Sequence, residues 1–240
     1  MDFLTSPDFW VALGQIIIID ILLGGDNAVV IALACRKLPP AQRTKGIIYG
    51  TAGAIVLRVI LIAFAMTLLN VPFLKLVGAL LLVWIGIKLI APGDDDHGNI
   101  EGSDRLWAAI KTIIVADLVM SVDNVIAIAG AAQNAGDHSL LLVILGLLIS
   151  IPIIVWGSQL VIKLMARFPI IITAGGMLLG WIAGGMLVTD PAVADPANMA
   201  WMFKLEQTDS IKYAAAVAGA LLVLALGKYM ASRQPRMEEA

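Results

Sequence analysis

The feature that most constrains this chain is a series of seven apolar runs, each of about 18–25 residues. A helix of that length spans the roughly 30 Å hydrocarbon core of a bilayer. The runs lie near residues 10–34, 47–69, 73–91, 107–132, 139–164, 169–189 and 212–230. Only 14% of the 240 residues are charged, whereas soluble domains carry about 25%. The sequence therefore predicts an all-α, polytopic membrane protein with seven transmembrane helices.

The composition also argues against several classes of function. The net charge is −2, which gives no indication of a nucleic-acid partner. The single cysteine, Cys35, cannot build a disulfide framework or a cysteine-based metal cage. No GxxxxGK(S/T) motif is present, so we expect neither direct use of ATP nor a resident cofactor. No Lys or Arg precedes the first apolar run, so this run is interpreted as a retained span and not as a cleaved signal peptide.

Basic residues predict the orientation of the spans, because loops on the cytoplasmic side are enriched in Lys and Arg. If seven spans alternate, one side carries twelve of them: Arg36, Lys37, Arg43, Lys45, Lys88, Arg105, Lys111, Lys163, Arg167, Lys228, Arg233 and Arg236. The other side carries only Lys75, Lys204 and Lys212, and Arg58 lies inside the second span. We therefore expect an inner-membrane protein with an extracytoplasmic N-terminus and a cytoplasmic C-terminus.

One polar motif occurs twice inside apolar runs. Both copies read D-x5-D-N, and they lie 97 residues apart. They comprise Asp20, Asp26 and Asn27 in the first span and Asp117, Asp123 and Asn124 in the fourth. The offset covers three spans, and an odd number of spans reverses the direction in which the second copy crosses the membrane. This arrangement predicts an inverted three-plus-three repeat, with a seventh helix added at the C-terminal end.

The same reasoning divides the chain into five parts. These are a first three-helix repeat at 1–92, an acidic cytoplasmic loop at 93–106, a second, inverted three-helix repeat at 107–189, an extracytoplasmic loop at 190–211, and a seventh helix with a basic cytoplasmic tail at 212–240. The acidic loop lacks EF-hand spacing, so it is interpreted as a solvated linker.

Four aspartates within spans need a physical explanation. Each costs about 2.5–3.5 kcal/mol at the centre of a spanning helix, so together they cost on the order of 10–14 kcal/mol. The fold must therefore place them against partners or water. On a regular helix Asp26 lies about 120° around the axis from Asp20. Gly24-Gly25 offers a point of unwinding that would turn Asp26 inward, whereas Ser121-Val122 is a weaker breaker, so the two halves need not be identical.

The ligand types of the motif indicate a hard cation. Carboxylate and amide oxygens suit manganese, calcium or magnesium, and no His, Cys or Glu lies beside them to favour zinc or copper. A competing interpretation is that the Asp–Asn pairs join helices while the aspartates stay protonated, but one Asn or Ser does this at lower cost. Arg58 is a possible counter-ion with two open roles: it releases the site when metal or protons arrive, or it balances one aspartate permanently.

The sixth span contains Gly176, Gly180 and Gly184 at GxxxGxxxG spacing. This spacing is typical of closely packed transmembrane helices, and a hinge is the less favoured alternative.

At the repeated motif the chain resembles the TerC family of integral membrane proteins. The resemblance rests on GGDNAVV at 24–30 and SVDNVIA at 121–127 and extends over nearly the whole chain. It implies a transporter fold with inverted three-helix repeats. It also implies manganese efflux, metal loading of exported proteins near the secretion machinery, or tellurium resistance. By this resemblance the expected ion-coordinating set is Asp20, Asp26, Asn27, Asp117, Asp123 and Asn124.

We therefore expect a transporter of divalent metal cations that exports manganese through a midplane site, with proton coupling as a candidate driving force. A calcium or magnesium exchanger is one alternative. A second is an accessory membrane protein of metal stress or secretion with no transport of its own. An intramembrane aspartyl protease needs only one aspartate from each of two helices, and the duplicated Asp–Asn motif does not fit that chemistry, so we expect no enzyme.

Overall fold

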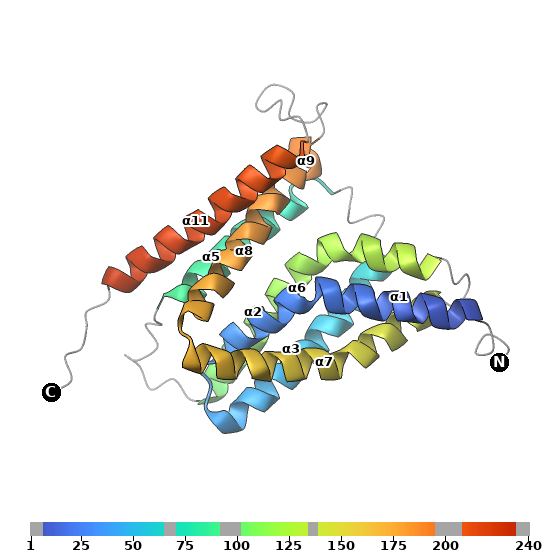
Figure 1. Ribbon diagram of the computed structural model, residues 1–240, viewed down its shortest axis with the longest axis horizontal. Coiled ribbons are helices and arrows are strands. Elements are labelled where there is room, and N and C mark those ends of the chain that lie inside the picture. The colour runs from blue at the N-terminus through green and yellow to red at the C-terminus, as the bar shows by residue number, and fades with distance from the viewer. Residues whose placement is uncertain (1–6, 65–70, 92–101, 134–138, 195–207, 234–240) are drawn as a thin grey trace. The chain divides into compact units, whose positions relative to one another are not determined.

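The computed structural model describes residues 7–64, 71–91, 102–133, 139–194 and 208–233 (Figure 1). Within these ranges every regular element is a helix, which confirms the predicted all-α class. The helices are α1 (Pro7–Leu23), α2 (Gly25–Cys35), α3 (Pro40–Ala63), α5 (Leu74–Ile90), α6 (Gly102–Gln133), α7 (Ser139–Arg167), α8 (Ile170–Thr189), α9 (Pro191–Ala194) and α11 (Asp209–Arg233).

Each of the seven predicted apolar runs coincides with helix, but their length and composition do not all support a crossing. Among the described residues, four helices are long and apolar enough to span a membrane, namely α3, α7, α8 and α11, and the bent pair α1–α2 makes a fifth if it is counted as one span. Helix α5 has only 17 residues, and α6 carries several charges. A multi-pass membrane protein is therefore supported, whereas the count of seven spans stays a prediction.

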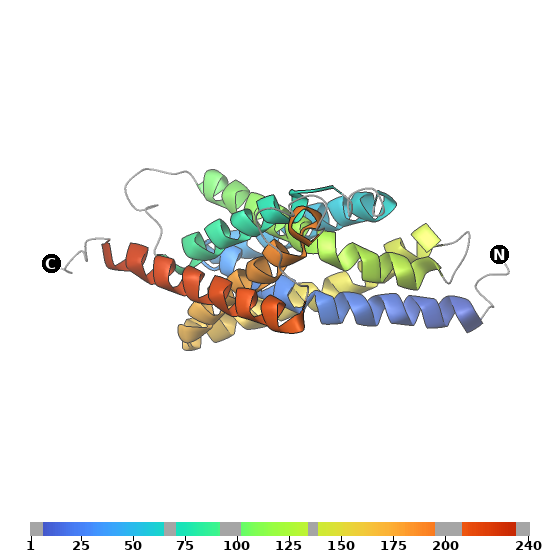
Figure 2. The ribbon, with the colours of Figure 1, turned by 90° about the horizontal axis from the view of Figure 1, so that it is seen from above.

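The helices form two compact units, which are described separately here. Unit 1 comprises Met1–Asn70 and Gly102–Leu164, and it contains α1, α2, α3, α6 and most of α7. Unit 2 comprises Val71–Glu101 and Met165–Ala240, and it contains α5, α8, α9 and α11. The course of each helix can be followed from above in Figure 2. Most residues of the two predicted loops, at 93–106 and 190–211, lie outside the described ranges.

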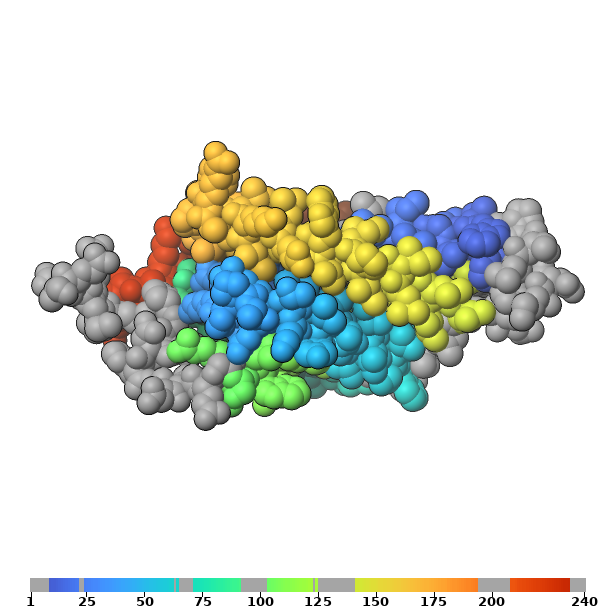
Figure 3. All heavy atoms as spheres, turned by 90° about the horizontal axis from the view of Figure 1, so that it is seen from below, coloured from blue at the N-terminus to red at the C-terminus, as the bar shows by residue number. Residues whose placement is uncertain are grey.

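Unit 1 is held together by close packing of α3 against α6. A Cβ atom on Gly50 or Gly53 of α3 would lie 2.6 Å from the Cδ1 atom of Ile113 or Ile114 of α6, so glycine permits this approach. Figure 3 shows side chains of α3 between those of α6 and α7 on one face of this unit. Exposed apolar side chains on α3 and α7, among them Val56 and Trp156, suit a surface that faces lipid.

Unit 2 is built on α8, which packs against both α5 and α11. Cβ atoms on Gly180 and Gly184 would collide with backbone atoms of α11, so these glycines bring the two helix backbones together. The close packing predicted from the GxxxGxxxG spacing is thereby confirmed. Asp190, which is fully buried, follows α8, and its carboxylate accepts hydrogen bonds from the backbone N–H groups of Phe73 and Leu76 at the start of α5, at 2.9 and 3.0 Å.

The two motif copies lie on differently shaped helices. In the first copy the chain breaks at Gly24, which has φ −101° and ψ 2°, and α1 and α2 meet at a bend of 45°. In the second copy α6 runs without interruption for 32 residues. These findings confirm that Gly24-Gly25 is a point of unwinding, that Ser121-Val122 is the weaker breaker, and that the two copies differ.

Candidate functional site

Three charged side chains from three helices of unit 1 meet in its interior. Arg58 of α3 forms ion pairs with Asp20 of α1 through Nη1 and with Asp117 of α6 through Nη2. Asp20 is 1% exposed, Arg58 3% and Asp117 8%. The two aspartates are the first acidic residues of the two motif copies, so the repeat places equivalent side chains on either side of one guanidinium group.

Two serines complete the hydrogen bonding of these carboxylates. Ser121 of α6 accepts a hydrogen bond from Arg58 Nε and donates one to Asp117 Oδ2, each at 3.0 Å. Ser150 of α7 donates to Asp20 Oδ2. Each carboxylate therefore has one oxygen on the guanidinium and the other on a serine hydroxyl. We call Asp20, Arg58, Asp117, Ser121 and Ser150 the charged cluster.

Pairing and hydrogen bonding make the charged cluster compatible with a buried, low-dielectric environment. Buried charges are tolerated only when they are paired and hydrogen-bonded. The planar guanidinium suits this task because its fixed donors can serve two carboxylates and a hydroxyl at once. When both carboxylates are ionised, however, one positive charge faces two negative charges, so the charged cluster retains a net charge of about −1.

The helix break places the rest of the first motif copy at the start of α2. A Cβ atom on Gly24 would collide with the carbonyl oxygen of Asp20, so the break depends on glycine there. Asp26 lies in the first turn of α2, and its Oδ1 accepts a hydrogen bond from the backbone N–H of Asn27 at 2.9 Å. A carboxylate in this position is favoured by the positive end of the helix dipole. The end of α1 meanwhile leaves backbone carbonyls without helical partners.

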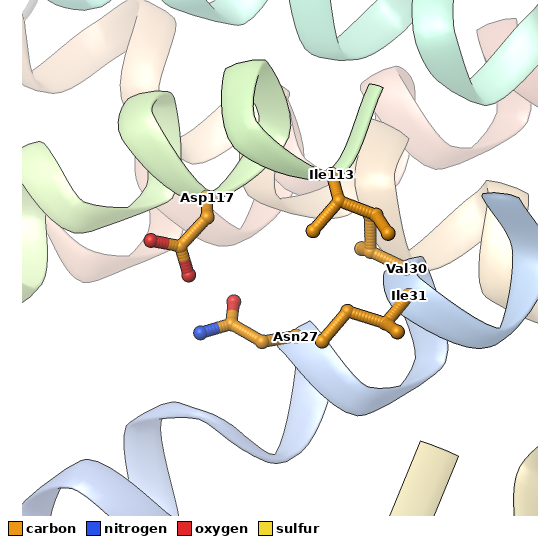
Figure 4. A pocket seen from close by; sticks show the side chains of 5 residues that line it. All are labelled: Asn27, Val30, Ile31, Ile113 and Asp117. Carbon is orange, nitrogen blue, oxygen red and sulfur yellow. The ribbon is translucent and has the colours of Figure 1, made fainter. Parts of the chain in front are cut away.

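Asn27 is the polar group whose surroundings most suggest a ligand. It is 4% exposed, and among the described residues neither its amide nitrogen nor its amide oxygen has a hydrogen-bond partner. It lines a small cavity of about 10 Å³ together with Val30, Ile31, Ile113 and Asp117. Figure 4 shows the Asn27 amide on α2 and the Asp117 carboxylate on α6 turned toward the same space. An orphaned buried amide needs a partner, and a water molecule or a cation would supply one.

The predicted ion-coordinating set is thus brought together in part. Asp20 and Asp117 meet through Arg58, and Asn27 borders a cavity with Asp117. Asp26 is half-buried and accepts a hydrogen bond from the backbone N–H of Asn27. Asn124 is half-buried on α6, whereas the side chain of Asp123 lies outside the described residues. Within the described ranges no three Asp, Glu, His or Cys side chains form a ready metal cage, and the six-residue set stays a prediction.

Sequence reasoning missed both serines as partners of the aspartates. Ser121 was considered only as a weak helix breaker, although its position four residues after Asp117 places it on the same helical face. The sequence could have indicated a buried partner for Ser150, because Ser150 carries the only hydroxyl in the apolar stretch from 140 to 157. A lone polar residue in such a stretch normally faces a partner inside the protein.

Together the apolar helices and the buried charged cluster define a class, that of multi-pass integral membrane proteins with ionisable groups in their interior. Comparison with known proteins gives the family. The integral membrane protein TerC family matches residues 5–235, and the chain belongs to it. The expected resemblance is thereby confirmed.

Several relatives share this family likeness. The uncharacterised membrane protein YjbE of Bacillus subtilis (strain 168) is 46% identical over 183 residues, which are 76% of this chain and 82% of that protein. YceF of the same organism, also described as an uncharacterised membrane protein, is 27% identical over 190 residues, 75% of this chain and 72% of its own. The inner membrane protein YgdQ of Escherichia coli (strain K12) is 30% identical over 189 residues, 69% of this chain and 75% of its own. No solved structure matches this chain.

Proposed function

We propose that this TerC family protein transports divalent metal cations across the inner membrane and that its activity is the export of manganese. The observation that carries the proposal is the charged cluster. Two buried aspartates from two copies of one motif share a single arginine, so the cluster keeps surplus negative charge. Ionisable residues inside membrane proteins typically line substrate or ion pathways, because their insertion cost must be balanced by a function.

The proposed substrate class follows from the donor atoms. Asp20 and Asp117 offer carboxylate oxygens, and Asn27 offers an amide oxygen without a partner among the described residues. The chain also breaks at Gly24, and the last carbonyls of a helix generally lack partners within that helix. Such hard oxygen ligands suit manganese, calcium and magnesium. The choice of manganese among them rests on the family resemblance and is the part of the proposal that a transport assay must decide.

The proposed architecture is an inverted repeat of seven spans. Unit 1 contains the first two apolar runs of each half of the chain, and unit 2 contains the third run of each half and the seventh run. Equivalent runs therefore occur together in each unit, as expected if the two halves are structural repeats. We propose alternating access by rocking of these repeats, with an extracytoplasmic N-terminus, a cytoplasmic C-terminus and proton coupling as the driving force.

Flux into proteoliposomes tests this function directly. Purified protein should move Mn²⁺ across the vesicle membrane, and Asp26→Asn or Asp123→Asn should abolish that flux while the protein still inserts. The matched control is Asp104→Asn, because Asp104 is exposed at the start of α6. Unchanged Mn²⁺ flux in both motif variants would remove the assignment.

The same assay separates the alternatives. Parallel measurements with Ca²⁺ and Mg²⁺, each with and without a pH gradient, identify a calcium or magnesium exchanger and test proton coupling. Absence of flux for every cation, together with co-purification of translocon subunits, would instead favour an accessory protein of secretion or metal stress.

A further inference from the structure

Arg58 lies where the proposed function would put the transported cation. Its guanidinium group is enclosed by the first aspartates of the two motif copies, with Nη1 on Asp20 and Nη2 on Asp117. Its third nitrogen, Nε, donates to Ser121, which itself bonds Asp117. Every hydrogen bond that Arg58 makes within the described ranges therefore goes to the carboxylates or to their serine.

Charge balance decides whether arginine and metal can share these carboxylates. Arg58 brings the two ionised aspartates from a charge of −2 to −1. A divalent cation added between the same carboxylates would leave a net charge of +1 while Arg58 stays in place. In a buried site of low dielectric, like charges a few ångströms apart repel strongly. Asp26 also attracts Arg58 electrostatically, but among the described residues only Asp20 and Asp117 form ion pairs with it.

Resting on the proposed cation transport, we propose that Arg58 is a tethered competitor of the cation: its guanidinium holds Asp20 and Asp117 when no metal is bound and is displaced when metal binds. The empty transporter then carries its own substitute cation, so no bare pair of carboxylates has to exist inside the membrane. This assigns Arg58 the first of the two roles considered from the sequence. A permanent counter-ion would leave both carboxylates tied in every state.

A small cavity borders one of these carboxylates. It is lined by Asp117 and Asn27, and neither Arg58 nor Asp20 is among its lining residues. A cation that enters this cavity meets Asp117 and the orphaned amide oxygen of Asn27. It competes there for a carboxylate that Arg58 holds through one nitrogen. Displacement can therefore begin at Asp117 before Asp20 is released.

The test is the sign of the change in metal affinity when Arg58 is replaced. Mn²⁺ binding to detergent-purified protein is measured from the loss of the electron paramagnetic resonance signal of free Mn²⁺. If Arg58 competes, Arg58→Gln lowers the dissociation constant by about tenfold or more, because coupling between close buried charges is that large. Arg58→Lys keeps the charge but cannot bridge both carboxylates with a planar fork, so it lowers the dissociation constant by a smaller factor.

Flux gives a second signature that a structural role would not produce. Without the competing arginine the bound metal leaves more slowly, so in proteoliposomes Arg58→Gln lowers both the KM and the maximal rate for Mn²⁺. The matched control is Arg43→Gln on the same helix. Within the described part of the chain, the hydrogen bonds of Arg43 go to the backbone carbonyls of Leu38 and Arg36, at 2.8 and 3.1 Å. Affinity and flux in this control should equal those of the wild type.

The outcomes separate this inference from the proposed function. If wild-type protein binds and transports Mn²⁺ but folded Arg58→Gln binds it equally or more weakly, the competitor role is wrong and transport stands. Folding is judged by size-exclusion chromatography, and Arg58→Lys, which keeps the buried charge, decides the question in the same way if Arg58→Gln does not fold. If the wild type neither binds nor transports Mn²⁺, Ca²⁺ or Mg²⁺, both proposals fall.

Discussion

The two copies of the D-x5-D-N motif use the same residues on different backbones. Asp20 lies near the end of α1 before a break, whereas Asp117 lies within the continuous helix α6. Both nevertheless present one carboxylate oxygen to Arg58 and the other to a serine. The duplicated aspartates therefore have equivalent partners even though the helices that carry them differ.

The difference between the copies is concentrated at one position. Four residues after Asp117 stands Ser121, which bonds it, and four residues after Asp20 stands Gly24, which breaks the helix. Because glycine has no hydroxyl, the first copy obtains its serine from another helix, as Ser150 of α7. One substitution within a duplicated segment thus changes both the backbone and the origin of a hydrogen-bond donor. It gives the first copy a helix end four residues after Asp20, whereas the second copy lies on an uninterrupted helix.

The largest effect we expect is from removal of either shared aspartate. Asp20→Ala and Asp117→Ala each leave Arg58 with one lost partner, and breaking a buried ion pair typically costs about 3–5 kcal/mol. If the copies are equivalent at this position, the two losses should agree within about 1 kcal/mol, which is well below the expected loss itself. Denaturant unfolding in detergent, followed by tryptophan fluorescence, measures both.

Asp104→Ala is the control for this pair, because that side chain is exposed on the same helix as Asp117. A large loss for one motif aspartate with little loss for the other would show that the duplication has not produced two equivalent carboxylates.

The second prediction tests the helix break that distinguishes the first motif copy from the second. Gly24→Ala places a methyl group against the carbonyl oxygen of Asp20, and such overpacking costs about 1–3 kcal/mol. Because the strain falls on the break itself, we also expect Mn²⁺ flux in proteoliposomes to fall sharply. Gly25→Ala is the matched control, since a Cβ atom there has no neighbour within 4 Å and alanine favours the first turn of α2. Equal flux in the two variants would mean that the break has no part in transport.

The sequence predicted the helices and the break better than it predicted the site. Apolar length placed the helix at 169–189 within one residue of α8, and two adjacent glycines were sufficient to locate the bend. The insertion cost of aspartate correctly required partners, but the identity of those partners depends on which helices are neighbours. That is why one arginine holding both aspartates, and Ser150 from α7, became clear only in the structure.

Helix α6 shows a second limit of sequence reasoning. It begins at Gly102, five residues before the predicted run at 107–132, because Ser103 and Asp104 are polar but favour the first turn of a helix. Hydropathy detects only the part of a helix that lipid or core would cover, so polar ends are lost.

The last prediction concerns stability alone and tests the serine that the first copy obtains from α7. Ser150→Ala removes the hydroxyl that donates to Asp20, and a hydrogen bond to a charged group contributes about 1.5–3 kcal/mol. Ser158→Ala is matched in helix, burial and chemistry, but among the described residues its hydroxyl bonds only the Ile154 carbonyl of its own helix, at 2.7 Å. We therefore expect a loss of about 1 kcal/mol or less in that control. The difference between their unfolding free energies isolates the contact with Asp20, and equal losses would show that Ser150 does not hold this carboxylate as Ser121 holds Asp117.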